Sequence, residues 1–293
     1  MAQTLTPTST KLTASASTWS DYIDALDTHF GGSSIWNVDL SNSDGSNNRG
    51  IAIVPDTTPQ GFSTNYQLNI RYDASSGYLY AAIDPNGNIT DPLDPTGTGS
   101  SEVSSESRRA GPSGPSYNTE FLLAEWDDAI GILWKDTGNA FFENWLLAGN
   151  IHDPYFPNDP DHNIDGLGWS GSSPQIDTNV YGDQDSGTSA SEAHSPDGWF
   201  SLSVKRYDDI TTIHPWNNNN HPAPHSLETA TQSNSTGNRR ALGEARYTYV
   251  WNSQSGGSGF TRLDSGTGDG FIFLSRGSDV SSLMPWDPSV SPS

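Results

Sequence analysis

The sequence contains no cysteine in 293 residues and only 13 lysines and arginines. Without cysteine, the chain can form neither disulfides nor thiolate metal sites. It also lacks any run of about 18 consecutive apolar residues, so we expect no membrane-spanning helix. The first five residues, 1–5, contain neither the basic region nor the apolar core of a secretory signal. If the protein works outside a cell, assembly into a particle released by lysis fits these absences.

Acidic residues, by contrast, are abundant. There are 35 of them, 27 being aspartate, and the formal net charge is −22. At roughly 1 M salt the Debye length falls to about 3 Å, so a carboxylate-coated surface repels itself little while it stays hydrated. This composition favours adaptation to concentrated salt over the alternative, an ordinary acidic protein from a low-salt organism. In either case we expect no nucleic-acid partner, because phosphate binding needs clustered Lys and Arg.

The apolar content is low at 32%, but 10 Trp, 11 Tyr and 10 Phe can still build a core. Short runs of strand character are separated by turn-forming residues, and 66–72 and 78–83 form a candidate hairpin across 74–77. We therefore predict a mainly β protein with a few short helices and an antiparallel, sandwich-like or jelly-roll-like core with long loops. The predicted strands are 51–54, 66–72, 78–83, 199–206, 245–251 and 271–274.

Helical spacing occurs in two regions. Apolar residues between Trp19 and Phe30 recur at helical intervals, and Gly31 follows. The most apolar stretch, 121–134, and the shorter 141–147 show similar spacing, which predicts a helical hairpin that plugs the core or an oligomer interface. The aromatic residues predicted to fill neighbouring subunits are Trp126, Trp134, Phe141, Phe142, Trp145 and Trp286.

Composition also divides the chain into parts. Residues 1–17 are rich in Thr and Ser and are predicted to form an extended arm. An N-terminal β-rich part then covers 18–95, and 96–118 is a loop or linker of Pro, Gly and Ser. The C-terminal α+β part with the helical plug covers 119–293. The same pattern also suits one continuous domain.

The strongest local motif lies at 161–166. Asp161, Asn163 and Asp165 occupy positions 1, 3 and 5 of a calcium-loop pattern, with Gly166 at position 6. Position 12, however, is Ser172 instead of the bidentate glutamate. This excludes an EF-hand and leaves two interpretations, a lone Ca²⁺ or Na⁺ site or a turn on an Asp-rich surface. No other cofactor is predicted.

The sequence also contains candidate residues for two further kinds of site. Glu120, Glu125 and Glu143 are candidate carboxylates for glycoside cleavage by residue type alone. Trp169 and Trp216, if exposed, could stack on sugars, although tryptophan in a core or an interface is the more frequent case. Neither a Gly-x-Ser-x-Gly elbow between a strand and a helix nor a phosphate-binding Gly-x-x-x-x-Gly-Lys is present. We therefore predict a protein that is not an enzyme.

Three segments carry a resemblance to a known group of proteins. The helix at 19–30, the turn Ala-Ile-Asp-Pro-Asn-Gly-Asn-Ile-Thr-Asp-Pro at 82–92 and the ending Leu-Met-Pro-Trp-Asp-Pro at 283–288 resemble virion structural proteins of tailed viruses that infect halophilic archaea. The resemblance is one of general character over most of the chain. It implies a non-enzymatic, symmetric subunit of a tail, baseplate or capsid turret, and it transfers no functional residue.

The predicted function is therefore a structural subunit of a virion, made in the host cytoplasm. Its expected partners are copies of itself and other virion proteins, with a host surface glycoprotein or glycan as a further contact in host attachment. One alternative is an adhesin that binds a carbohydrate or glycoprotein, and the other is a glycoside hydrolase. Loss of glycan binding in Trp169→Ala or Trp216→Ala would favour the adhesin, whereas turnover abolished by one carboxylate-to-amide change would favour the hydrolase.

Overall fold

The structure is a computed structural model. It describes residues 6–15, 21–56, 67–97, 107–110, 118–136, 143–150, 152–154, 165–169, 191–195, 198–205, 223–229, 241–252, 262–264, 270–275 and 280–292.

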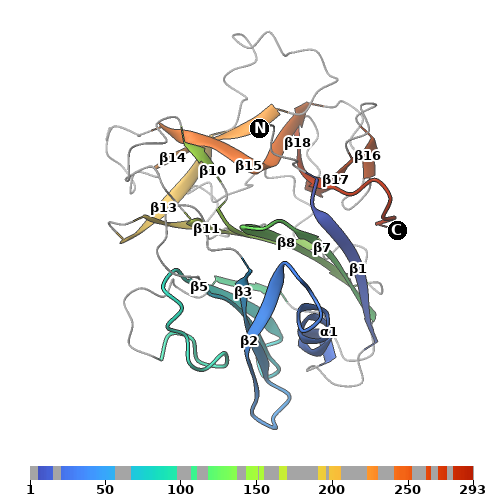
Figure 1. Ribbon diagram of the computed structural model, residues 1–293, viewed down its shortest axis with the longest axis vertical. Coiled ribbons are helices and arrows are strands. Elements are labelled where there is room, and N and C mark those ends of the chain that lie inside the picture. The colour runs from blue at the N-terminus through green and yellow to red at the C-terminus, as the bar shows by residue number, and fades with distance from the viewer. Residues whose placement is uncertain are drawn as a thin grey trace.

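The described strands form two antiparallel sheets (Figure 1). The smaller sheet has the order β2-β3-β4-β5-β6, with strands Trp36–Ser43, Arg49–Pro55, Gln67–Asp73, Tyr78–Asp84 and Ser107–Ala110. The larger sheet has 13 strands, in the order β1-β7-β8-β9-β11-β12-β13-β14-β15-β18-β17-β16, with β10 paired to β15. The fold is thus mainly β and antiparallel, as predicted. All six predicted strands are present, including the β4–β5 hairpin.

The strands of the larger sheet have the following bounds: β1 Thr8–Ser15, β7 Asn118–Glu125, β8 Ala129–Asp136, β9 Glu143–Gly149, β10 His152–Pro154, β11 Asp165–Trp169, β12 Ser191–Ser195, β13 Gly198–Lys205, β14 Ala223–Thr229, β15 Ala241–Asn252, β16 Arg262–Asp264, β17 Gly270–Ser275 and β18 Val280–Trp286.

Strands β7 to β9 form the middle of three layers. One of their faces meets the smaller sheet, and the shared core includes Ile53, Ile70, Phe121 and Ile132. On the other face β18 approaches, because a Cβ built on Gly131 would lie 2.4 Å from Met284 Sδ. Figure 1 shows this order, with β7 and β8 between the smaller sheet and the strands β15 and β18.

This burial corrects the predicted helical hairpin at 121–134 and 141–147. Phe121 and Leu123 point into the core shared with the smaller sheet, while Leu122 and Ala124 are equally buried outside that core cluster. A strand covered on both faces is apolar at every position, so it loses the alternation that identifies a strand. Short apolar runs of this kind cannot be told from a buried helix by periodicity alone.

The predicted helix at 19–30 is present as α1 (Asp21–Phe30). Tyr22, Ile23, Leu26 and Phe30 are buried and join the core of the smaller sheet. The chain leaves the helix at Gly31, whose N–H donates to the carbonyl of Asp27 at 2.8 Å. The apolar spacing of this segment therefore predicted its buried face correctly.

The chain before α1 contributes to the larger sheet. Residues 8–15 of the predicted extended arm form strand β1, which pairs with β7 from Thr8 opposite Glu125 to Ser15 opposite Asn118. They thus form an edge strand of the larger sheet. Similarly, 107–110, inside the predicted linker, form β6 on the edge of the smaller sheet. The division of the chain into parts stays a prediction.

The close approach of β8 and β18 leads us to a prediction about the stability of the protein. Gly131→Ala should lower the free energy of unfolding by about 1–3 kcal/mol, because its methyl group would overlap the buried Met284. Gly32→Ala is the matched control, since its Cβ would meet only the His29 carbonyl at 3.7 Å. Denaturant unfolding measures both variants, and equal midpoints would contradict the packing of β18 on β8.

Candidate functional site

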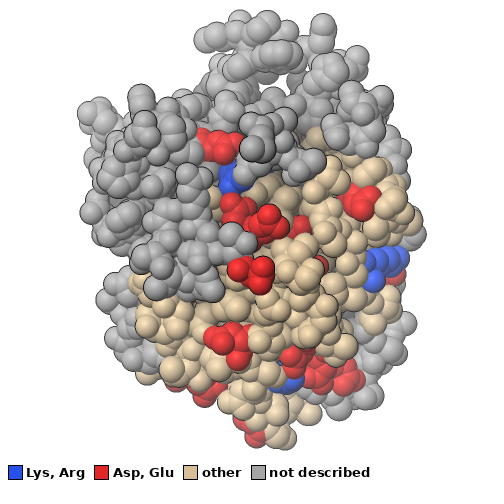
Figure 2. All heavy atoms as spheres, in the orientation of Figure 1, with Lys and Arg blue, Asp and Glu red and all other residues tan. Residues whose placement is uncertain are grey.

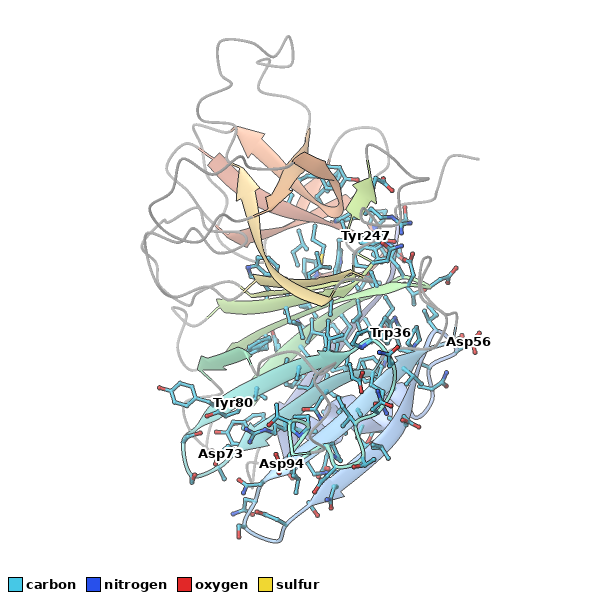
Figure 3. The ribbon with its side chains drawn as sticks, turned by 90° about the vertical axis from the view of Figure 1, so that its left-hand side faces the viewer. Trp36, Asp56, Asp73, Tyr80, Asp94 and Tyr247 are labelled. Atoms are coloured by element: carbon cyan, nitrogen blue, oxygen red, sulfur yellow. The ribbon has the colours of Figure 1, made fainter. Side chains whose placement is uncertain are left out.

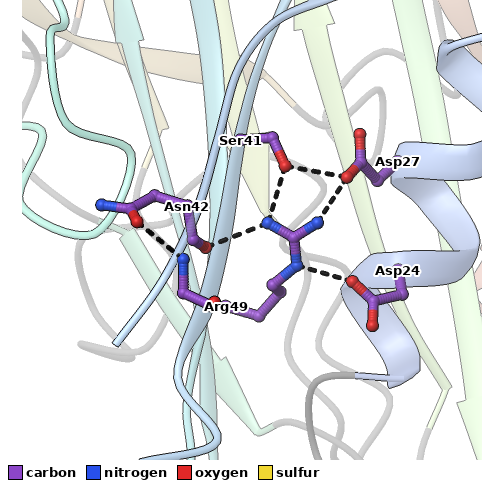
Figure 4. Close-up of polar contacts among 6 residues, drawn as sticks. Asp24, Asp27, Ser41, Asn42 and Arg49 are labelled. Carbon is purple, nitrogen blue, oxygen red and sulfur yellow. Dashed lines mark hydrogen bonds and ion pairs between the residues drawn. The ribbon is translucent and has the colours of Figure 1, made fainter. Parts of the chain in front are cut away.

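The first of three polar clusters lies where α1 meets β2 and β3. We call it the Arg49 cluster (Asp24, Asp27, Ser41, Asn42 and Arg49; Figure 4). Arg49 Nε donates to Asp24 Oδ1 at 2.6 Å, and Nη2 donates to Asp27 Oδ2. Its Nη1 donates to Ser41 Oγ at 2.7 Å and to the Asn42 carbonyl at 3.0 Å. The guanidinium thus joins the helix to the two strands.

The Arg49 cluster borders a hollow of about 400 Å³, lined by Asp24, Ser41, Asn42, Ser43 and Arg49. Two carboxylates face one guanidinium, so the cluster carries a net negative charge. The side chain of Asp24 is 48% exposed, whereas that of Arg49 is only 14% exposed. The Arg49 cluster therefore connects α1 to β2 and β3, and its Asp24 carboxylate is partly exposed to solvent.

The second cluster joins α1 to the middle layer. His29 Nε2 lies 2.6 Å from Glu125 Oε1, and Ser33 Oγ donates to Glu125 Oε2 at 2.9 Å. The Glu125 side chain is 1% exposed, so both of its oxygens are satisfied inside the protein. Next to it, Trp36 Nε1 donates to the Trp126 carbonyl at 2.9 Å. We call His29, Ser33 and Glu125 the Glu125 latch, because it ties the helix to the end of β7.

The third cluster joins the β7–β8 turn to β15. Asp128 accepts hydrogen bonds from Arg246 Nη1 at 2.7 Å, Tyr247 Oη at 2.8 Å and Asn150 Nδ2 at 3.2 Å. The ring of Tyr247 also stacks on Trp126, with centroids 4.2 Å apart. This Asp128 cluster therefore connects the middle layer to the layer that contains β15.

Protonation in the Asp128 cluster follows from its surroundings. Burial raises the pKa of the Tyr247 phenol, and the charge of Asp128 raises it further. Burial opposes the charge of Arg246, but the neighbouring Tyr247 and Asp128 outweigh it, and the pKa of Arg246 rises. At neutral pH the phenol is therefore a hydrogen-bond donor and the guanidinium is a cation.

The aromatic residues predicted to fill neighbouring subunits lie inside the chain. Exposed fractions are 6% for Trp126, 4% for Trp134, 1% for Trp145 and 0% for Trp286. These rings are buried within the chain itself, so the structure corrects the interface role predicted for these four. Phe141 and Phe142, which carried the same prediction, lie outside the described residues.

The predicted cation loop is described only at its end. Asp161 and Asn163 lie outside the described residues, and Asp165 begins β11, where its backbone pairs with His194. Within the described part of the chain, no three His, Asp or Glu side chains gather in a way that could hold a metal ion. The Ca²⁺ or Na⁺ site stays a prediction.

Two of the three candidate carboxylates for glycoside cleavage have partners in the structure. Glu120 lies 3.2 Å from Lys11 Nζ in a surface ion pair, whereas Glu125 is the buried centre of its latch. Glu143 begins β9, and Trp169 ends β11. Trp216 lies outside the described residues. The structure thus assigns structural partners to two of the three acids.

Sequence reasoning missed His29, Arg49 and Arg246. Their partners are distant in the chain, since 96 residues separate His29 from Glu125 and 118 separate Arg246 from Asp128. The sequence offered one signal for the two arginines: arginine is scarce, with only ten residues in a chain that has 35 acids.

Comparison of the chain with protein-family models, with curated proteins and with solved structures finds no match. Among the described residues, no helix has the length and apolar character needed to cross a membrane.

From the Glu125 latch we predict how much stability its buried carboxylate contributes. Glu125→Ala should lower the free energy of unfolding by about 3–5 kcal/mol, because it leaves His29 and Ser33 without their buried partner. The control is Glu120→Ala on the same strand, which removes a partly exposed ion pair with Lys11 and should cost no more than about 1 kcal/mol. Thermal or denaturant unfolding compares them, and similar losses would refute the latch.

Proposed function

We propose that this protein is a non-enzymatic structural subunit of a virion, in a tail, baseplate or capsid turret, and that it assembles with copies of itself in concentrated salt. Contact with a host surface is a secondary role of the same particle. The proposal combines the acidic composition and the resemblance of three segments to virion proteins with the layered antiparallel fold.

One observation carries the salt-adapted part of the proposal. The structure describes the side chains of four basic residues, and each contacts an acid or a ring of its own chain. Lys11 pairs with Glu120, Arg49 with Asp24 and Asp27, and Arg246 with Asp128, while Arg71 lies over the ring of Tyr80. On the face drawn in Figure 2, blue side chains lie beside red ones, and further red patches stand apart from any blue.

Such a surface has an electrostatic consequence. Because the chain has 13 bases and 35 acids, 22 negative charges have no base to balance them. At low ionic strength these carboxylates repel one another across about 10 Å, and this repulsion opposes the folded state. Concentrated salt removes the repulsion and leaves the hydrated surface, which suits a particle that persists in brine.

The assembly contacts must come from residues other than the four buried tryptophans. A side chain with 6% exposure or less offers no surface to a neighbouring copy. Edge strands are a general alternative, because they present unpaired backbone groups. In the described part of the chain, β1, β2, β6 and β16 end the two strand orders. We propose these edges as the first places to seek contacts between subunits.

A carbohydrate-binding adhesin is the second candidate function. One observation favours it: Tyr78 is 36% exposed, the one large hydrophobic side chain described as exposed. An exposed aromatic ring on a rigid strand can pack against a ligand at little cost in conformational entropy.

The salt dependence of stability tests the proposed environment. Raising KCl from about 0.1 M to about 2 M should increase Tm by more than about 4 °C, since the carboxylate repulsion is screened over that range. Thermal unfolding followed by circular dichroism measures the shift, with sucrose of equal osmolality as the control. A Tm that is flat or falls with KCl would refute salt adaptation.

Assembly is tested separately by mass. Light scattering in about 2 M KCl, where surface repulsion is screened, should give a mass several times 31.5 kDa. A single species of 31.5 kDa at all protein concentrations in brine would contradict the homo-oligomer.

A further inference from the structure

Strand β1 is the longest uninterrupted edge strand in the described part of the chain. Its eight residues pair with β7 on one side without a register shift, and no described strand pairs with its other side (Figure 1). Of the other described edges, β6 has 4 residues, β16 has 3, and the pairing of β2 with β3 shifts between Val38 and Leu40. Alternate residues of β1 therefore direct their backbone N–H and C=O groups away from β7.

The residues along this edge remain accessible. Thr8 and Thr13 are exposed, and the three residues between Ser9 and Thr13 are partly exposed. At the start of the strand, Ser9 Oγ accepts a hydrogen bond from the Asp287 N–H at 3.0 Å. Strand β1 is thus held in position by β7 and by the segment that follows β18, while its outer side is available for pairing.

The charge around β1 differs from that of the chain as a whole. Residues 1–20 contain no acid, although the chain has 35 acids and a formal net charge of −22. On the neighbouring β7, Glu120 lies 3.2 Å from Lys11 Nζ, and Glu125 is buried in its latch. Two copies that meet through β1 therefore oppose no carboxylates along the paired strands, although their net charges repel.

We propose that β1 pairs with β1 of a second copy in antiparallel orientation, so that the larger sheets of two copies continue into each other across a two-fold axis. Such pairing satisfies the outward N–H and C=O groups of both edge strands. Charge favours a second copy as the occupant, because its β1 is as free of acids as the edge that it meets. The inference rests on the proposed assembly of the protein with copies of itself, and it names the contact surface.

The register of this pairing follows from symmetry. In an antiparallel pair, hydrogen-bonded and non-hydrogen-bonded residue pairs alternate, so each residue must face one of the same kind. A two-fold axis also requires that if one residue faces another, the second faces the first. Both conditions hold only when one residue of the strand faces its own copy. In the middle of β1, that residue is Lys11 or Leu12.

Charge decides between these two registers. With Lys11 on the axis, two ammonium groups would stand directly opposite each other, and like charges in this position destabilise a strand pair. With Leu12 on the axis, Lys11 faces the uncharged Thr13 of the second copy. We therefore assign the register in which Leu12 lies on the axis and residues 9–15 of the two copies pair.

Leu12 also gives this register an apolar centre. Its Cα partner on β7 is Phe121, and it packs, partly buried, against the core between the smaller sheet and the middle layer, where Figure 3 shows Trp36. Opposite residues of a strand pair project from the same face of a sheet, so the two Leu12 side chains would lie next to each other. Each copy thereby covers the exposed border of the core of the other.

Cysteine cross-linking tests the register directly, because the chain has no cysteine of its own. Opposite Cα atoms of an antiparallel pair are about 4.5–5.5 Å apart, which a disulfide can span, whereas diagonal neighbours at about 7–8 Å are too distant. The full chain is oxidised with diamide in about 2 M KCl, where the net charge is screened. Under these conditions, Leu12→Cys should form a covalent dimer.

The neighbouring positions give a second, independent measurement. An equal mixture of Lys11→Cys and Thr13→Cys should form mixed dimers, because these two residues face each other across the axis. Each of the two variants alone should form at least about tenfold less covalent dimer, because each residue is diagonal to its own copy. Mass spectrometry distinguishes the mixed dimers from those of each variant.

Controls separate specific pairing from random collision and from loss of the fold. Ser46→Cys, which is exposed in the turn between β2 and β3, is the matched control for collision between copies. Thermal unfolding under reducing conditions shows whether each variant is folded. Because Leu12 packs against the core, the mixture of the Lys11 and Thr13 variants decides if Leu12→Cys is unfolded.

Three results would overturn the pairing of β1 with its copy. They are cross-linking of folded Leu12→Cys no greater than that of Ser46→Cys, mixed dimers no more frequent than dimers of each variant alone, and efficient cross-linking of Lys11→Cys by itself. Any of these with a mass of several subunits in brine would leave the proposed assembly intact and refute this contact. A mass of 31.5 kDa in brine would contradict the assembly as well.

Discussion

Burial of β7, β8 and β9 on both faces is the constraint on which the rest of the structure depends. Side chains at alternate positions of these strands enter two different cores, one shared with the smaller sheet and one facing β18. A chain with only 32% hydrophobic residues must concentrate its apolar side chains in this way to cover a central layer. The aromatic residues are accordingly used inside, and Trp145 and Trp286 have almost no exposed surface.

The positions of the three polar clusters follow from the stacking of the layers. Each one connects elements that the apolar core brings together: the Arg49 cluster at the helix, the Glu125 latch at the end of β7, and the Asp128 cluster between β8 and β15. Buried polar groups are tolerated only when their hydrogen bonds are made, so these contacts favour one arrangement of the layers over others. The four bases whose side chains the structure describes serve these clusters and local pairs, in a chain that carries 35 acids.

The net negative charge of the chain limits which partners the molecule can bind. With a formal net charge of −22, the chain as a whole repels anions at long range, and salt screens this repulsion. In the described part of the chain, the free edges of the two sheets, β1, β2, β6 and β16, are the proposed places of contact between subunits.

Local patterns determined part of this fold. The alternation of Leu68, Ile70 and Tyr72 with polar Asn69 and Arg71 predicted β4, because one face of that strand meets a core and the other does not. The spacing in 19–30 predicted α1 for the same reason. The middle strands could not be predicted, because residues such as Leu122 and Leu133 are buried on a second face that only another layer provides.

The candidate sites divide in the same way. Composition determined that the surface is acidic, that cysteine chemistry is absent and that each base is scarce. Only the tertiary structure decided that Glu125 meets His29, that Asp128 meets Arg246 and that four predicted interface tryptophans are core residues. The physical reason is that charge and periodicity are properties of a local segment, whereas a pair of side chains about a hundred residues apart is set by how the layers stack.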